Sequence, residues 1–221
     1  MFENVEKSGR RLWLQVKDEI FARFLQKNGK ITSRQEVPPS SVERYKGKLP
    51  DLLLGYWLEH GWFGCGEGLF WVVNPQEYEG VVAAWLSGTA LEGRDTYHLV
   101  ARSAFGDLYL YGERTGFSLS IDAPVSRYSL IDDAVVFEDR DLNTQNFLLL
   151  MDEEYNDFDG LFKSAKKKLG APSADEMYGF VPALGLGGRT EVESIEKVKC
   201  VEHLVFLSQL ADFRPFSQED I

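Results

Sequence analysis

The stretch that decides the fold runs from Leu49 to Trp85 and reads LPDLLLGYWLEHGWFGCGEGLFWVVNPQEYEGVVAAW. Pro50 can open a helix, because the N–H that proline lacks would be unpaired in a first turn anyway. Apolar and aromatic residues then recur three and four positions apart as far as His60, and Gly61 can adopt the left-handed conformation that ends a helix. The stretch therefore predicts a helix that closes at Gly61.

The second half of this stretch predicts a strand followed by another helix. Glycines at positions 64, 66 and 68 indicate a turn, and the β-favouring run Leu69 to Val73 follows it. Asn74 can cap the next helix, Pro75 fits its first turn, and Glu77 can reach back to the N–H of the cap. Four of the five Trp residues lie between Leu49 and Trp85. We expect this unit to be core, and it contains no catalytic motif.

The charge of the chain restricts its partners. Its 221 residues include 35 Asp plus Glu against 24 Lys plus Arg, a net charge of −11, and 44% of them are hydrophobic. The hydrophobic content is enough to bury a sizeable core. An acidic surface repels nucleic-acid phosphates and anionic lipid headgroups and attracts a basic protein. We therefore expect no direct binding to nucleic acid or membrane, with solubility as the alternative reason for the acidity.

The cysteines and the N-terminus predict a cytoplasmic protein. Cys65 and Cys200 are too few and too far apart for a disulfide framework, and their apolar or glycine neighbours favour buried free thiols in a reducing compartment. The first residues, MFENVEKSGRRLWLQVKDEIF, carry charges throughout every apolar run. This pattern argues against a signal peptide and against a transmembrane helix.

Before and after the central stretch, the apolar pattern predicts two kinds of element. An amphipathic helix is expected from Leu12 to Lys27, ended by Asn28-Gly29, with a polar connection through the two prolines Pro38 and Pro39. From Tyr97 the pattern changes to that of strands, predicted at Tyr97–Arg102, Asp107–Tyr111 and Phe117–Ile121. In the third strand the apolar residues alternate with Ser118 and Ser120, so one face should pack on helices and the other should be partly wet.

The rest of the chain predicts a helical lobe. Residues 124–128 are expected to be loop, with helices over 143–151 (capped by Asn143), 161–169 and 201–210. The fold class is therefore α+β, a central antiparallel meander sheet packed by helices, with a smaller mostly helical C-terminal lobe. We place the domain boundary between residues 128 and 129, giving domains 1–128 and 129–221.

No catalytic constellation is visible, and neither a catalytic residue nor a cofactor nor a metal site is predicted. His60, His98 and His203 each lack a second His or Cys at ligand spacing. The glycine-rich run at 185–190 lacks the lysine followed by Ser or Thr that a phosphate-binding loop needs. An enzyme, such as a small hydrolase pairing Cys65 with His98, is one alternative and has only residue type in its favour.

Two acidic windows are the candidate partner-binding sites, and both lie after the predicted sheet. They can be solvated surface, calcium ligands, or docking loops in which charge speeds encounter and aromatics anchor a basic protein. The glycine and the terminal Glu of an EF-hand loop are missing. We predict docking, at Asp132, Asp133, Glu138, Asp139 and Asp141 of the first window and Asp152, Glu153, Glu154, Tyr155 and Asp157 of the second.

Two longer segments resemble known families. The run from Leu49 to Leu86, followed by EGRDTYHLVARSAFGDLYLYGERTG, resembles the GAD-like domain. The later run EMYGFVPALGLGGRTEVESIEKVKCVEHLVFLSQL is similar to the small uncharacterised domain that commonly follows it. Together the resemblances extend from about residue 39 to residue 210. The pairing is typical of immunity proteins that neutralise antibacterial nuclease toxins, particularly DNase effectors of type VI secretion systems.

The resemblance implies a function that the residues alone do not reveal. It implies a cytoplasmic antitoxin, not an enzyme, that binds a cognate nuclease toxin and blocks its active site. An acidic protein can occupy the basic cleft of a DNase much as DNA does. The alternative is a non-catalytic protein-binding or scaffold module of the SMI1/KNR4-like type. The family supplies no fixed functional residues, so the acidic windows remain the candidate interface.

Overall fold

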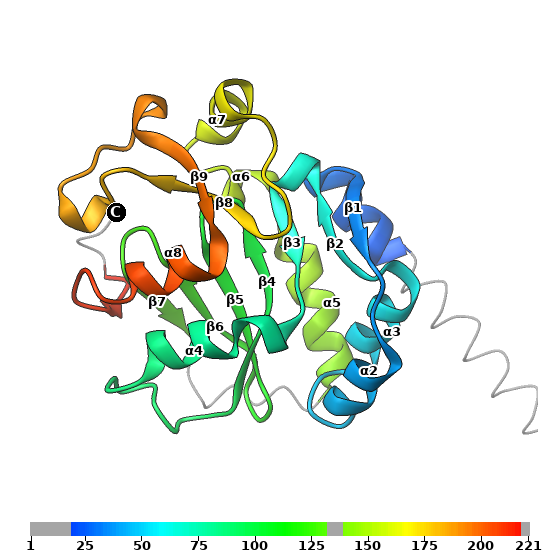
Figure 1. Cartoon of the computed structure of the whole chain (residues 1–221). Helices are drawn as coiled ribbons and strands as arrows, with labels where there is room; N and C mark the ends of the chain where they lie inside the picture. Colours follow the sequence, from blue (N-terminus) through cyan, green and yellow to red (C-terminus); the bar gives the residue numbers. More distant parts are fainter. Residues whose placement is uncertain (1–18, 132–138, 218–221) are drawn as a thin grey trace, which may run out of the picture.

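A computed structural model describes residues 19–131 and 139–217 of the chain, and its main feature is one large sheet (Figure 1). Across this sheet the strands follow one another as β1 (Ile31–Gln35), β2 (Trp62–Cys65), β3 (Phe70–Val72), β4 (Tyr97–Ser103), β5 (Asp107–Gly112), β6 (Gly116–Asp122), β7 (Arg127–Leu130) and β10 (Arg214–Pro215). All neighbours pair antiparallel except β7 and β10. The predicted α+β fold with a central meander is confirmed.

Helices and a small second sheet complete the described part. After a first helical segment over 19–28, the helices are α2 (Pro39–Tyr45), α3 (Asp51–His60), α4 (Glu79–Leu86), α5 (Arg140–Leu150), α6 (Glu153–Asn156), α7 (Leu161–Leu169) and α8 (Cys200–Leu207). Strands β8 (Glu176–Phe180) and β9 (Ile195–Lys199) pair antiparallel beside α7 and α8. No helix within residues 19–131 and 139–217 is long and apolar enough to cross a membrane.

The helix predicted from the central stretch is α3. It starts directly after Pro50 and ends at Gly61, whose positive φ of 76° favours glycine. Its buried face includes Leu52, Tyr56 and Trp57. Asn74 also caps as predicted, its side chain accepting a hydrogen bond from the Gln76 N–H at 3.2 Å. The local signals in this stretch therefore determine both helix boundaries.

Gly64 was interpreted wrongly as part of a turn. It lies in the middle of β2, pairing with Trp71 of β3. A Cβ on Gly64 would lie 2.7 Å from the Trp71 ring. The glycine is therefore required by the close approach of an aromatic side chain, and the turn itself begins at Gly66.

The polar connection predicted after residue 28 is also wrong, because it contains β1 and α2. Pro39 does not prevent α2; it occupies the first helical position, where the fixed φ of proline is favourable. The expected loop at 124–128 likewise contains the start of β7, a fourth meander strand that pairs with β6. Trp13 and Val16, assigned to the first helix, lie outside the described residues.

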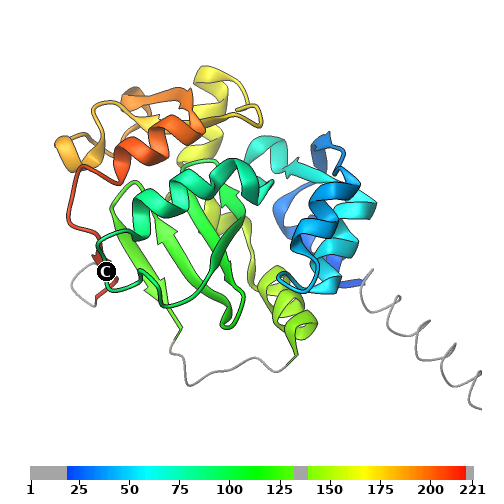
Figure 2. The ribbon, with the colours of Figure 1, turned by 60° about the horizontal axis from the view of Figure 1, so that its bottom comes forward.

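The meander is covered on both faces, unequally. Leu108, Leu110, Leu119 and Ile121 pack in one cluster with residues of α4 and α8, which Figure 2 shows lying together along one side of the strands. On the other face α5 packs against β6, and the ring of Phe117 stacks on that of Phe147 with centroids 4.0 Å apart. The predicted alternation placed Phe117 on the same face as Leu119 and Ile121, but it packs on the opposite face. The wet face is the part of this second face that α5 leaves open.

The two halves of the chain share a core. Met177, Cys200 and Leu204 belong to the same buried cluster as Leu108 and Leu119. Cys65 and Cys200 are both buried free thiols, as predicted. The boundary between residues 128 and 129 stays a prediction, and the C-terminal lobe packs directly on the meander.

Candidate protein-docking site

The first acidic window is only partly within the described residues. Asp132, Asp133 and Glu138 lie outside them. Asp139 caps α5 by accepting a hydrogen bond from the Leu142 N–H at 2.9 Å. Asp141 accepts one from the N–H of Leu52, in the first turn of α3, also at 2.9 Å. These two carboxylates therefore hold helices in place.

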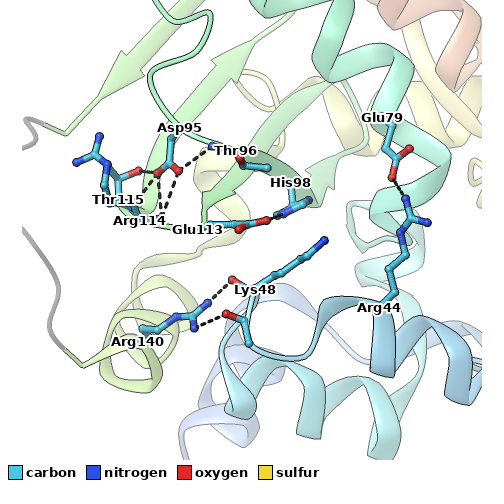
Figure 3. A network of polar contacts seen from close by, with 11 residues as sticks. Arg44, Lys48, Glu79, Asp95, Thr96, His98, Glu113, Arg114, Thr115 and Arg140 are labelled. Carbon is cyan, nitrogen blue, oxygen red and sulfur yellow. Dashed lines mark hydrogen bonds and ion pairs between the residues drawn. The ribbon is translucent and has the colours of Figure 1, made fainter.

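Arg140, the base of this window, anchors the start of α5 (Figure 3). Its guanidinium donates to the Tyr111 hydroxyl at 3.0 Å and to the carbonyl oxygens of Gly47, at 3.0 Å, and Lys48. In the same view, Asp95 accepts hydrogen bonds from the backbone N–H groups of Arg114 and Thr115, which lie in the turn between β5 and β6. The contacts of Arg140 thus fix the N-terminal end of α5 relative to the segment that leads into α3, and those of Asp95 hold the β5–β6 turn.

The second acidic window surrounds α6, and most of its acids are also paired within the molecule. Asp152 caps α6 and lies 3.4 Å from the Lys27 ammonium. Glu153 lies 3.1 Å from Lys163, and Asp157 accepts a hydrogen bond from the Gly160 N–H at 3.0 Å. Glu154 is exposed, and Tyr155, at 72%, is the most exposed large hydrophobic side chain among the described residues.

A groove that the sequence interpretation missed lies beside Tyr155. Its larger section has a volume of about 660 Å³ and lies between α5 and the open face of β6 and β7. A second section of about 350 Å³ shares Tyr109, Ser120 and Ser129 with the first and continues toward Tyr155. We call these two joined sections the groove. Serines form its floor, and the apolar residues Phe147, Leu149, Leu150 and Met151 line the side given by α5.

Large hydrophobic side chains stand exposed around the groove. Ile131, 44% exposed, lines the first section. Leu150, 67% exposed, and Phe216, 42% exposed, line the second section together with Tyr155. Single exposed apolar residues are ordinary, whereas a group of them around one hollow makes a candidate interaction site. The sequence signal was the run of serines alternating with apolar residues in β6.

Two carboxylates close one end of the groove. Asp107 starts β5 and Asp122 ends β6, and the two residues are direct cross-strand partners. Asp107 accepts a hydrogen bond from the Ser103 hydroxyl. The buried Oδ1 of Asp122 has no hydrogen-bond partner in the part of the chain that the structure describes. Both are acids, and the other described residues that line the groove are uncharged.

Burial changes the acidity of this pair. It raises the pKa of Asp107 to about 6. Burial, together with the charge of Asp107, raises the pKa of Asp122 to about 7, from an ordinary value of 3.8. Near neutral pH the pair therefore holds charge that its surroundings oppose.

We expect the stability of Asp122→Asn against urea, measured relative to the wild type, to be higher at pH 8 than at pH 5. A carboxyl whose pKa is raised on folding contributes stability below its unfolded value and loses it as the pH rises through its folded value, here about 7. The gain of the variant over the wild type should grow by about 1–3 kcal/mol between the two pH values. Asp212→Asn, at an exposed site, should show no such change. An equal difference in stability between the variant and the wild type at both pH values would contradict a raised pKa of Asp122.

The structure does not bring together the dyad considered for an enzyme. In the sheet, Cys65 of β2 pairs with Phe70 of β3, and Phe70 pairs with Ser103 of β4. His98 lies on β4 too, but five residues away from Ser103. That separation corresponds to about 16 Å along a strand. Burial raises the pKa of the Cys65 thiol to about 12, and His98 instead contacts Glu113 at 2.9 Å. Within the described ranges no three His, Cys, Asp or Glu side chains are grouped to hold a metal ion.

Comparison with known families matches two successive parts of the chain. Residues 19–125 match the GAD-like domain, and residues 141–211 match the family described as T6SS immunity protein Tdi1, C-terminal. A crystal structure of Atu4351 from Agrobacterium tumefaciens has a TM-score of 0.77 at 21% identity, covering 90% of this chain and 94% of that one. It shows the same fold. No curated protein matches this sequence.

Proposed function

Since residues 19–125 match the GAD-like domain and residues 141–211 match the C-terminal domain of a type VI secretion immunity protein, we propose that this protein neutralises a cognate secreted antibacterial nuclease. It acts in the cytoplasm by binding the toxin and covering its active site, and it has no catalysis of its own. The observation that carries this proposal is the match of residues 141–211 to a type VI secretion immunity family, directly after a GAD-like match.

Charge and site chemistry support this proposal. The net charge of −11 suits a nuclease, whose own surface must bind phosphate. The two residues considered for an enzyme have structural surroundings: the Cys65 thiol is buried with a raised pKa, and His98 pairs with Glu113. The open groove with its exposed rim is suited to a protein segment.

The experiment that tests the proposed function uses affinity capture and a cleavage assay. The tagged protein is recovered from cells that make the toxin, and mass spectrometry identifies what accompanies it. We expect one stoichiometric partner with a nuclease domain, whose cleavage of DNA stops when the purified protein is added. Recovery of unrelated proteins alone, or cleavage that continues in excess protein, would contradict the proposal and favour a scaffold module.

In the second acidic window, Glu154→Lys should slow association with the toxin. We expect a decrease of about two- to fivefold in the association rate at low salt, with a weaker dependence on salt and no change in thermal midpoint. Glu154 is the suitable position because Asp152 and Glu153 have intramolecular partners. Glu43→Lys, an equally large charge change on α2, is the control. If stopped-flow measurements give the same rate for both variants, this window is outside the interface.

A further inference from the structure

We propose that the groove binds a segment of the toxin that carries apolar side chains and one cationic side chain, the cation meeting Asp122 and Asp107. This inference rests on the proposed function, because it identifies where and how the toxin is bound. Its partner chemistry follows from three features of the groove: its size, the hydrophobic rim and the acidic end.

The size and lining of the groove suit a short peptide segment. Its two sections, of about 660 and 350 Å³, together exceed the volume of a single side chain and match the range of ligand-binding clefts. Phe147, Leu150 and Met151 offer an apolar wall along α5, and Tyr155 stands at the far end. Aromatic and large aliphatic residues around a hollow are typical anchors of protein interfaces. Apolar side chains of the partner would cover the exposed rim.

The acidic end selects the charge of the segment. The Asp122 carboxylate is hydrogen-bonded by the backbone of Val125, which lowers its pKa, but its buried Oδ1 has no hydrogen-bond partner among the described residues. A buried oxygen in that position costs stability unless something pairs with it. Arg127 is the cross-strand partner of Asp122 and lowers its pKa, but this guanidinium also donates to the carbonyl oxygens of Val125 and Ser126. Asp159 acts in the opposite direction and raises the pKa of Asp122. A Lys or Arg side chain from the partner would give this Oδ1 a donor and add positive charge to that of Arg127.

The same chemistry excludes other classes of ligand. Two carboxylates repel phosphate groups, so neither a nucleotide nor a nucleic acid suits this end of the groove. Buried groups with shifted pKa values that destabilise a fold tend to mark functional sites. Net charge agrees with the choice, because a protein of charge −11 attracts a basic partner over a distance.

The test measures affinity for the nuclease recovered by capture, in a catalytically inactive form, by isothermal titration calorimetry. Leu150→Glu should weaken binding about tenfold or more, because it places a charge on the apolar rim. Leu58→Glu, on α3 and 63% exposed against 67% for Leu150, should not change the affinity. Asp122→Asn should weaken binding about tenfold, and Asp212→Asn should not. The urea midpoint of Asp122→Asn at the pH of the titration shows whether the variant is folded, so misfolding can be separated from a loss of affinity.

A photo-cross-linker at Ser129, on the groove floor, identifies the bound segment. We expect a toxin peptide in which Lys or Arg lies among apolar residues. Wild-type affinity in both Leu150→Glu and Asp122→Asn, or a cross-linked peptide without a cation, would overturn the inference and leave the proposed function intact. A wild-type protein that does not bind the nuclease would overturn both. If Leu150→Glu instead abolishes a dimer seen by light scattering while toxin affinity is unchanged, a second copy occupies the groove and the inference is wrong.

Discussion

Arg102→Ala is expected to lower the free energy of unfolding by about 3–5 kcal/mol, because it removes a fully buried cation on which several groups depend. The Arg102 Nε donates to the Tyr78 hydroxyl at 3.1 Å. One terminal nitrogen donates to the carbonyl oxygens of Ala174, at 2.8 Å, and Glu176, at 3.1 Å. Its guanidinium also lies 5.2 Å from the centroid of the Trp71 ring. Truncation leaves these oxygens without their donor and opens a cavity.

The position of these contacts makes the prediction informative about architecture. Arg102 belongs to the part of the chain that matches the GAD-like domain, and both carbonyl oxygens belong to the part that matches the C-terminal immunity domain. Urea unfolding followed by Trp fluorescence measures the loss. Arg44→Ala, which removes an exposed ion pair with Glu79, is the control and should not move the midpoint. If Arg102→Ala unfolds at the wild-type midpoint, the link between the two parts is not a source of stability.

Local signals in the sequence predict the elements whose boundaries are chemical. Pro50 and Gly61 delimit α3, Asn74 caps the segment after β3, and the helix predicted at 161–169 is α7. The three meander strands were also predicted, since alternation and turn residues agree there. In each case the residues that determine the element lie within it or directly beside it in the sequence.

Elements that depend on distant partners could not be predicted in this way. β1 is polar and exposed over most of its length, and pairing with β2 makes it a strand. Gly64 resembles a turn residue until Trp71 is placed against it. The helix over 143–151 was predicted with Asn143 as its cap, but α5 begins earlier, at Arg140 after the cap Asp139. Asn143 instead accepts a hydrogen bond from the Phe117 N–H at 2.9 Å.

In the candidate site, too, features of local sequence could be predicted and features that depend on distant residues could not. The acidic windows stand out in composition, yet the described acids act largely as caps and ion-pair partners. The groove is assembled from β5, β6, β7 and α5, and no short window contains it. Asp107 and Asp122 become neighbours only through the register of the β5–β6 hairpin. Their role as toxin-binding residues, like that of the windows, stays a prediction.

Trp57→Ala is expected to cost about 3–5 kcal/mol of stability, as large aromatic truncations in a packed core do. Trp57 is 1% exposed, and its ring packs edge-on against Tyr45, with centroids 5.7 Å apart, and against Trp62, at 5.8 Å. Its indole nitrogen has no acceptor among the described residues, so Trp57→Phe should cost much less, since it removes an unpaired N–H along with part of the ring. Leu58→Ala, one position along α3 and largely exposed, is the matched control and should change stability by less than about 0.5 kcal/mol. Equal urea midpoints for Trp57→Ala and Leu58→Ala would mean that the stretch from Leu49 to Trp85 is not the core on which the sheet is built.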